Sequence, residues 1–270
     1  MKNKLAILGA GNMGLAIADG IISSGMLMPK EILLVRRNIE KLSAYVERGF
    51  EASSDLVRAA AESESLIIAV KPQMMDDILD IIAPYCKDKL VISIAAGVRI
   101  ATIENKLPGA RVVRAMPNTP LTVGEGVTEL CRSENVSDEE FKFAESLFSG
   151  AGYTFVCKED EINALTALTS SAVAYFAAIE AAMSDWALEN GLSDYDCRVL
   201  CDLVSKTAIG SAKLLYDKQL SPEALIKAVA SPKGTTEQAL NVFKEKDLEG
   251  LFKDAMSACL KRAEELSKAE

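Results

Sequence analysis

The first fourteen residues restrict the fold more than any other part of this chain. Residues 4–8 form a short apolar run, and Gly9, Gly11 and Gly14 follow it at the spacing G-x-G-x-x-G. A segment with apolar residues at helical spacing then begins at Leu15. Strand, glycine turn and helix in this order are the context of a dinucleotide-binding fingerprint, whereas the glycine spacing alone also fits an ordinary Gly-rich turn.

Each glycine of this segment has a separate physical task. Gly9 permits the tight turn, Gly11 lets the backbone approach a pyrophosphate, and Gly14 lets the helix pack closely on the strand. We expect the helix to begin near Asn12, so that the N–H groups of Asn12 and Met13 and the positive end of the helix dipole face the anion.

The second predicted strand, residues 31–35, is followed directly by Arg36 and Arg37. In NAD-binding units an acidic residue near this point holds the ribose 2′-hydroxyl. Positions 34–38 contain no acid, and two guanidinium groups suit a 2′-phosphate instead. The sequence therefore favours NADP, with NADPH preferred over NADH, although both arginines also fit solvated charges at the start of the next helix.

The rest of the first half alternates short apolar strands with helices, which indicates βαβ units and a parallel sheet. We expect strands at 4–8, 31–35, 51–52, 65–70, 90–93, 111–115, 126–130 and 153–156, and helices at 12–22, 39–48, 55–61, 74–83 and 137–149. Ligands of such sheets bind at the carboxyl ends of the strands. Gly9, Arg36, Lys71 and the turn 95–97 (with Ala95 and Gly97) follow strands, so they are expected to line one crevice. The loop around Asn118 also follows a strand, and it fits either a cofactor-facing loop or a plain edge turn.

From Glu159 onward we expect only helices, at 161–190, 194–216, 222–230, 235–246 and 247–268. The first is alanine-rich and about 30 residues long, which suggests the buried spine of a helical domain or a dimer interface. The predicted fold class is α/β: a Rossmann-type parallel sheet domain at residues 1–157, then an all-α domain at residues 158–270.

Composition excludes several functions. The net charge of −9 argues against nucleic-acid binding, and we expect no apolar run long enough to cross a membrane. The chain starts with a strand, so no signal peptide is expected. Six scattered cysteines without any histidine suggest reduced thiols in a cytoplasmic protein and no metal site. The missing histidine also removes the commonest proton donor of dehydrogenases.

One loop of the helical half offers anion-binding groups. In Ser231-Pro-Lys-Gly-Thr-Thr236, the proline ends a helix, Gly234 is expected to take a left-handed turn, and Thr235 or Thr236 to cap the next helix. Free N–H groups, two hydroxyls and a helix dipole could bind a carboxylate. The same sequence also fits an ordinary connection between helices.

Five motifs occur in a specific order along the chain: Gly9–Gly14, Ala69–Gln73, Ser93–Gly97, Arg114–Pro120 and Ser231–Thr236. Further residues in the helical half belong to the same pattern: Glu180, Asp185, 190–192, Arg262 and 265–266. By these residues the chain resembles the pyrroline-5-carboxylate reductase family along essentially its whole length. The resemblance implies reduction of the cyclic imine 1-pyrroline-5-carboxylate to L-proline, the last step of proline biosynthesis, with NADPH or NADH. The iminium form is already protonated, which fits a chain without histidine.

The resemblance also implies residue roles. Ala69, Val70, Lys71 and Pro72 would border the nicotinamide and its ribose, with Asn118 and Thr119 near the ring. Ser231, Gly234, Thr235 and Thr236 would hold the substrate carboxylate, and Thr236 would hydrogen-bond the ring nitrogen. Thr236 and Lys71 are the expected catalytic residues. The helical domain would pair two chains, with the loop completing the partner's site, and such homodimers can form a decamer.

Two departures from the family pattern leave alternatives open. The family's Gly-Ser-Gly-Pro-Ala-Tyr is Ser170–Tyr175 here, and Lys233 replaces the first glycine of Ser-Pro-Gly-Gly-Thr-Thr. A reductase of a related imine and a non-catalytic regulatory paralogue therefore remain possible. A β-hydroxy-acid dehydrogenase is disfavoured, because such enzymes carry a lysine on the long helix and residues 161–190 contain none.

Overall fold

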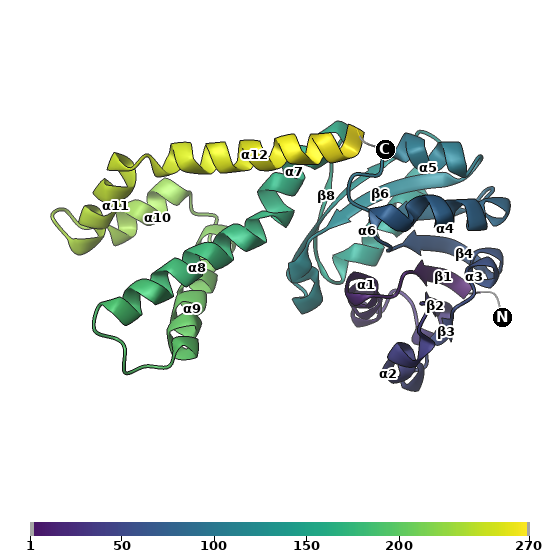
Figure 1. Ribbon diagram of the computed structural model, residues 1–270, viewed down its shortest axis with the longest axis horizontal. Helices are drawn as coiled ribbons and strands as arrows, with labels where there is room; N and C mark the ends of the chain where they lie inside the picture. Colours follow the sequence, from purple (N-terminus) through teal and green to yellow (C-terminus); the bar gives the residue numbers. More distant parts are fainter. Residues whose placement is uncertain (1–2, 269–270) are drawn as a thin grey trace. The chain divides into compact units, whose positions relative to one another are not determined.

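The structure, a computed structural model, describes residues 3–268 and divides into two compact units (Figure 1). The first unit contains the chain up to Ser170 together with the residues from Cys259 onward, and the second contains Ser171–Ala258. The two units divide after Ser170, later than the domain boundary predicted between residues 157 and 158. That boundary marks where the dinucleotide-binding part is expected to end, and it stays a prediction.

The first unit is built on an eight-stranded sheet in the order β3-β2-β1-β4-β5-β6-β7-β8. The strands are β1 Asn3–Leu8, β2 Ile32–Val35, β3 Glu51–Ser53, β4 Ser63–Ile68, β5 Leu90–Ser93, β6 Arg111–Pro117, β7 Gly126–Arg132 and β8 Gly152–Val156. All pairs among them are parallel except β6 with β7. The predicted strands and the Rossmann-type sheet are confirmed, with one antiparallel pair added.

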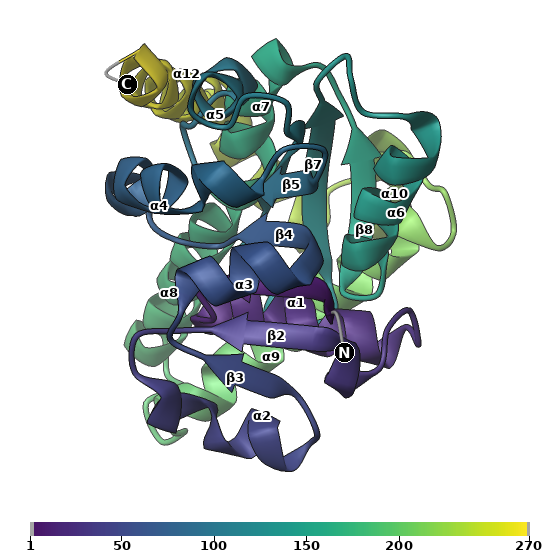
Figure 2. The same ribbon diagram turned by 90° about the vertical axis from the view of Figure 1, so that its right-hand side faces the viewer.

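Alternation along the strands builds two apolar layers, one on each face of the sheet. On β1, Leu5 and Ile7 belong to the layer that includes Ile17 of α1 (Asn12–Ser23), whereas Leu8 faces the opposite layer. Successive strand residues point to opposite faces, so a run that is apolar throughout needs cover on both sides. Figure 2 shows this sheet with α1, α3, α4, α5 and α6 around it.

The helices of the first unit largely follow their predicted start signals. They are α2 Ser43–Glu47, α3 Leu56–Glu62, α4 Met75–Ile82, α5 Ile100–Lys106, α6 Asp138–Ser149 and α7 Ile162–Leu165. The Asp55 side chain caps α3 by accepting from the N–H of Arg58, and Ser137 caps α6 in a capping box. We did not predict α5, which has no side-chain cap at Arg99.

The predicted helix over 161–190 is wrong as one continuous element. α7 passes into a π-helical segment, Thr166–Ser170, and α8 begins only at Ala172 and ends at Glu189. The hydroxyls of Thr166 and Thr169 donate to the carbonyls of Ile162 and Leu165, 2.8 and 2.9 Å away. Such bonds to the carbonyl four residues earlier compete with the helix ladder and bend helices.

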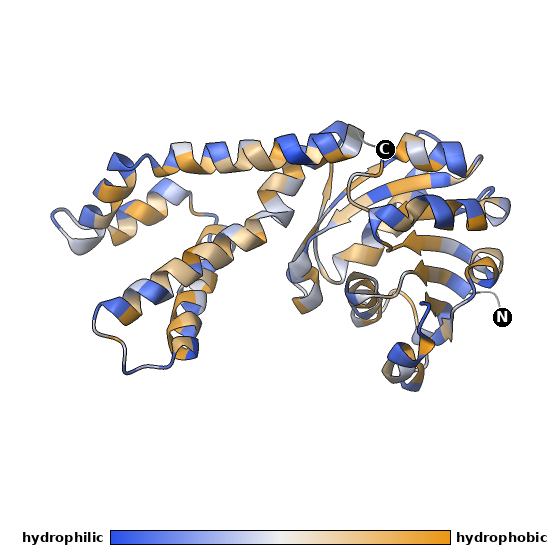
Figure 3. Cartoon of the chain, viewed as in Figure 1, coloured by the Kyte–Doolittle hydropathy of each residue, from blue (hydrophilic) through white to orange (hydrophobic). Residues whose placement is uncertain are grey.

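The second unit contains α8, α9 (Cys197–Tyr216), α10 (Pro222–Val229) and α11 (Thr235–Glu245), and α12 (Leu248–Lys268) crosses from it into the first unit. Apolar side chains are exposed along one stripe of α8, among them Phe176, Met183 and Trp186, and Figure 3 shows this helix largely in apolar colours. The stretch Glu159–Glu189 is long and apolar enough to cross a membrane by length and composition, so our expectation that no such run exists is wrong.

Candidate active site

The glycine loop after β1 has the predicted geometry. Gly9 has a φ of +95°, and its N–H and that of Ala10 donate to the carbonyl of Val35 at 3.0 and 2.9 Å. A Cβ on Gly9 would lie 2.6 Å from the carbonyl oxygen of Ala69, in the loop after β4. Only glycine fits this turn, which joins the ends of β1, β2 and β4.

Gly14 and Gly11 are glycines for different reasons. A Cβ on Gly14 would lie 2.9 Å from the carbonyl oxygen of Gly9 and 3.1 Å from the Ile7 side chain, so its role in packing the helix on the strand is confirmed. A Cβ on Gly11 would meet nothing closer than 3.9 Å, and its φ of −91° suits any residue. Nothing in the described part of the protein requires a glycine at 11, and its role at a pyrophosphate stays a prediction.

Helix α1 begins at Asn12, as predicted, with Gly11 as its N-cap and no side-chain cap. The first N–H groups of a helix have no partners inside the helix, and those of Asn12, Met13 and Gly14 lie at this end. No acidic side chain is present in the first turn. The positive end of the dipole is therefore left for an anion.

Arg36 is fixed beside this loop. Its Nη1 donates to the carbonyl of Ala10 at 3.1 Å, and its backbone N–H donates to Ser53 on the neighbouring strand. Arg37 is exposed. The structure thus places one anchored and one solvent-facing guanidinium at the end of β2, next to the glycine loop.

The loops after β4 and β5 continue the same edge of the sheet. The N–H of Ala69 donates to Leu8 at 2.7 Å, and Val70 and Lys71 lead into a 3₁₀ turn that opens at Pro72. The Lys71 side chain is exposed. After β5, Ala95 is buried, so only its backbone can reach a ligand, whereas Gly97 turns with a φ of +84°.

Asn118 lies at the same edge after β6, but its side chain already makes two hydrogen bonds within the protein. Its Oδ1 accepts from the N–H of Val127 at 2.8 Å, and its Nδ2 donates to the carbonyl of Thr169 at 3.4 Å. Thr119 opens a 3₁₀ turn, Thr119–Val123. Any contact of Asn118 with a cofactor therefore comes from a side chain held rigidly by the fold.

A small cavity of about 200 Å³ lies at this edge, and it includes residues that the sequence did not indicate. Pro72 and Gly97 line it together with Arg114, Met116 and Asn163. Arg114 is 3 % exposed, and its Nη1 is 3.2 Å from Oε1 of Glu159. A buried ion pair between distant parts of the chain leaves no local sequence signal.

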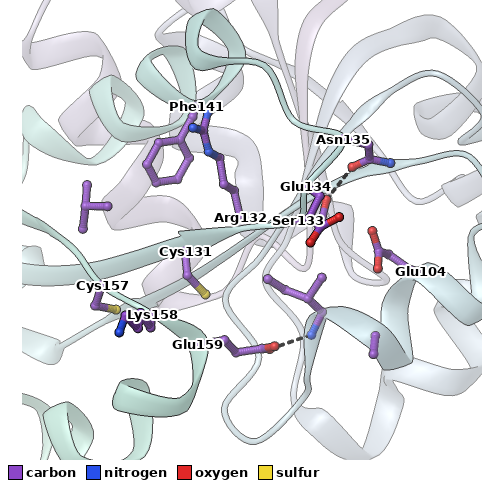
Figure 4. A pocket seen from close by; sticks show the side chains of 13 residues that line it. Glu104, Cys131, Arg132, Ser133, Glu134, Asn135, Phe141, Cys157, Lys158 and Glu159 are labelled. Atoms are coloured by element: carbon purple, nitrogen blue, oxygen red, sulfur yellow. Dashed lines mark hydrogen bonds between the residues drawn. The ribbon is translucent and has the colours of Figure 1, made fainter.

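A larger cavity of about 720 Å³ lies elsewhere on the first unit (Figure 4). Glu104, Arg132, Asn135 and Lys158 line it, with Cys131 buried at its wall. None of the residues predicted to bind a cofactor or a substrate lines this cavity. Burial raises the pKa of the Cys131 thiol to about 12, helped by the nearby Glu159 carboxylate, so the thiol stays protonated.

The substrate loop predicted between Ser231 and Thr236 belongs to the second unit. Lys233, not Gly234, takes the left-handed conformation, with a φ of +64°, and Gly234 is extended at −80°. Gly234 is instead favoured by packing, because a Cβ there would lie 2.9 Å from the carbonyl oxygen of Ser231. The predicted cap by Thr235 or Thr236 is also wrong, since Gly234 is the N-cap of α11 without any side-chain cap.

The start of α11 nevertheless keeps its anion-binding groups. The hydroxyls of Thr235 and Thr236 lie in the first turn beside N–H groups that the helix leaves without partners. The carboxylate of Glu237 accepts from the backbone N–H of Lys233 at 2.7 Å and so stabilises the left-handed turn.

Comparison with known proteins agrees with this architecture. The sequence profile of pyrroline-5-carboxylate reductase dimerisation matches residues 159–266, and a profile described as NADP oxidoreductase coenzyme F420-dependent matches residues 4–97. A pyrroline-5-carboxylate reductase of Methanosarcina acetivorans is 34 % identical, over 99 % of this chain and 100 % of that protein. The chain belongs to the pyrroline-5-carboxylate reductase family.

Other members of the pyrroline-5-carboxylate reductase family are similar over their full length. The Escherichia coli enzyme is 32 % identical over all of both chains. The Coxiella burnetii enzyme superimposes with a TM-score of 0.91, at 32 % identity over 99 % of each chain. A Plasmodium falciparum pyrroline carboxylate reductase with NADP bound gives a TM-score of 0.87, at 25 % identity over 98 % of each chain. The glycine loop is thus part of an NAD(P)-binding fold.

Proposed function

We propose that this chain reduces 1-pyrroline-5-carboxylate to L-proline with NADPH, the last step of proline biosynthesis. The observation that carries the proposal is the loop Gly9–Gly14, whose turn and helix packing require Gly9 and Gly14 while leaving the Gly11 position open to a ligand. It occurs in a chain that matches pyrroline-5-carboxylate reductases from end to end.

The reaction suits the groups that this chain provides. When bound, the reduced nicotinamide supplies a hydride to the imine carbon, and the imine nitrogen already carries its proton. The protein then has to orient the reactants and place charges, not supply a strong acid, and the sequence has no histidine. Ala69–Pro72, with Lys71, and the 118–119 loop are proposed to border the nicotinamide.

For the substrate, we assign the carboxylate to the loop that includes Ser231 and Gly234 and to the first turn of α11, at Thr235 and Thr236. Thr236 is proposed to hydrogen-bond the ring nitrogen. Substitution Thr236→Ala should lower kcat while leaving NADPH binding unchanged, and Thr235→Ser, which keeps the hydroxyl, is the matched control. Wild-type protein that binds NADPH yet never oxidises it with this substrate would support the non-catalytic alternative.

The NADP preference is proposed from Arg36 and Arg37. The cation at Arg36 is held against the carbonyl of Ala10, where it could pair with a 2′-phosphate of the cofactor. Michaelis constants for NADPH and NADH test this: the double variant Arg36→Ala/Arg37→Ala should lose affinity for NADPH and keep it for NADH. Equal constants for wild type and variant would contradict the assignment.

A homodimer is proposed to cover the apolar stripe of the second unit. Phe176, Ile179, Met183 and Trp186 of α8 are between 42 % and 68 % exposed in the single chain, more than a soluble helix leaves uncovered. The matched family profile is that of reductase dimerisation. A second copy, not a bilayer, is therefore the proposed cover, and a decamer and a cytoplasmic location belong to the same proposal. Light scattering measures the assembly.

A further inference from the structure

Glu129, near the middle of β7, is a buried carboxyl group with no cation as partner among residues 3–268. Its cross-strand neighbours are Met116 on β6 and Phe155 on β8, and the residue is only 1 % exposed. Its Oε1 is 2.7 Å from Oγ1 of Thr169, and its Oε2 makes no hydrogen bond to any described residue. A carboxylate in this position would be a buried charge with half of its acceptors unsatisfied.

Hydrogen-bond counting at Thr169 favours a protonated Glu129. The Thr169 hydroxyl has one proton, but it lies within bonding distance of two oxygens, Oε1 of Glu129 at 2.7 Å and the carbonyl of Leu165 at 2.9 Å. If Glu129 were ionised, both oxygens would be acceptors and one would lack a proton. If Glu129 is protonated, it donates to Thr169, and Thr169 donates to Leu165. The protonated form gives each of the two contacts a proton of its own, whereas the ionised form makes them share one.

The same hydrogen bonds hold a loop of the proposed active site. The carbonyl of Thr169 accepts from Nδ2 of Asn118, and Asn118 exchanges two further bonds with Val127, two residues before Glu129 on β7. Thr169 lies in the π-helical segment Thr166–Ser170, a rare local departure from the α-helix that often occurs at functional sites. Asn118 is thus held by Val127 on one side and by the Thr169 carbonyl on the other, and a fixed Thr169 side chain contributes to the second contact by holding the turn that carries this carbonyl.

We propose that Glu129 is a protonated positioning residue: its carboxyl proton fixes Thr169 and, through Thr169, the Asn118 loop for hydride transfer. This role rests on the proposed reductase function, because only that function places the loop at the nicotinamide. Loss of the proton frees the Thr169 hydroxyl from the Leu165 carbonyl, and the loop loses its alignment.

Among the titratable and charged groups packed around Glu129, Glu129 itself is the one that we expect to change its protonation state with pH. On β6, Arg114 is on the same face but is paired with Glu159. On β7 and directly after β8, burial raises the pKa values of Cys131 and Cys157 to about 12 and 11, so both thiols stay protonated. Burial also raises the pKa of Glu129 above its ordinary value of 4.5. The folded state therefore binds this proton more tightly than the unfolded chain, and stability falls as pH rises towards the raised pKa.

The test compares Glu129→Gln and Glu129→Ala in the full-length protein. Glutamine cannot ionise but can donate to Thr169, so it should rescue most of the kcat lost in the alanine variant and abolish the decline of kcat at high pH. The alanine variant should lose about tenfold in kcat with little change in the KM for NADPH. Glu145→Gln is the matched control, because Glu145 also accepts from a threonine, Thr154, at 3.0 Å, and should leave the profile unchanged.

A second measurement needs no catalysis. The infrared C=O band of a protonated carboxylic acid should be present in the wild type at neutral pH and absent from Glu129→Gln. Absence of the band from the wild type, or an unchanged alkaline decline in Glu129→Gln, would overturn the proposal. If the wild type shows the band but no turnover of pyrroline-5-carboxylate, the proposed function fails while the protonation of Glu129 stands, and the positioning role falls with the function.

Discussion

Glu159 offers the sharpest test of how the first unit is held together. Its Oε1 accepts two hydrogen bonds, from the N–H of Ile100 at the start of α5 at 2.7 Å and from Nη1 of Arg114 at 3.2 Å. The Arg114 side chain is 4 % exposed and that of Glu159 is 23 % exposed. Figure 4 shows Glu159 with the first of these bonds. Removing the carboxylate leaves a buried guanidinium without its counter-charge.

The expected cost can be estimated from these contacts. Breaking a buried ion pair by removing one partner costs about 3–5 kcal/mol. Because Glu159 is partly exposed, water can replace some of its bonds, and Glu159→Ala should lie near the lower value. With a urea m-value of roughly 3 kcal/mol/M, the unfolding midpoint should fall by about 1 M. Glu159→Gln keeps an acceptor for Ile100 and should lose about half as much.

Urea unfolding followed by circular dichroism, at one protomer concentration, measures these shifts. The matched control is Glu62→Gln, which removes the exposed i,i+4 pair of Arg58 and Glu62 at 2.9 Å and should cost less than about 0.5 kcal/mol. The double variant Arg114→Met/Glu159→Ala should be more stable than Glu159→Ala, because it no longer buries a lone charge. A Glu159→Ala midpoint equal to that of the control would refute the reasoning.

Three further predictions follow from the structure. Gly11→Ala should change the stability of the cofactor-free protein by less than about 0.5 kcal/mol but weaken NADPH binding, measured by fluorescence, at least about tenfold. Equal losses of stability and binding would count against the ligand role of this position. Because Lys233 has a φ of +64°, Lys233→Gly should stabilise the protein by up to about 1 kcal/mol in urea unfolding, whereas Lys233→Ala should give no gain. A gain in stability with alanine would be inconsistent with backbone strain. Cys131 is buried and its thiol pKa is raised to about 12, so mass spectrometry should detect alkylation of Cys131 only after urea has unfolded the protein. Rapid labelling of Cys131 in buffer would contradict the burial of this thiol.

Much of the first unit could be predicted from local patterns. Buried parallel strands need apolar side chains on both faces, so runs such as residues 65–68 and 90–93 are recognisable. Gly9 and Gly14 could be assigned because their tasks depend on immediate neighbours in the strand–turn–helix unit. The caps Asp55 and Ser137 are equally local signals.

Features that depend on contacts between residues far apart in the sequence could not be predicted. Helix α5 has seven residues and no capping side chain, so its start is set by Glu159, 59 positions later. The left-handed residue of the second-unit loop was assigned to Gly234, because glycine is the default there, but that glycine serves packing against Ser231. The hydrogen bond between Thr169 and Glu129 joins residues 40 positions apart, and no local pattern reveals it.

The most direct test of the account is transfer of a labelled hydride. NADPH carrying deuterium at the transferred position of C4 is incubated with pyrroline-5-carboxylate and purified protein, and the product is analysed by mass spectrometry. The account predicts L-proline with one deuterium on the former imine carbon, formed in equal amount to the NADPH oxidised. Protein that binds NADPH but yields no deuterated proline would contradict it.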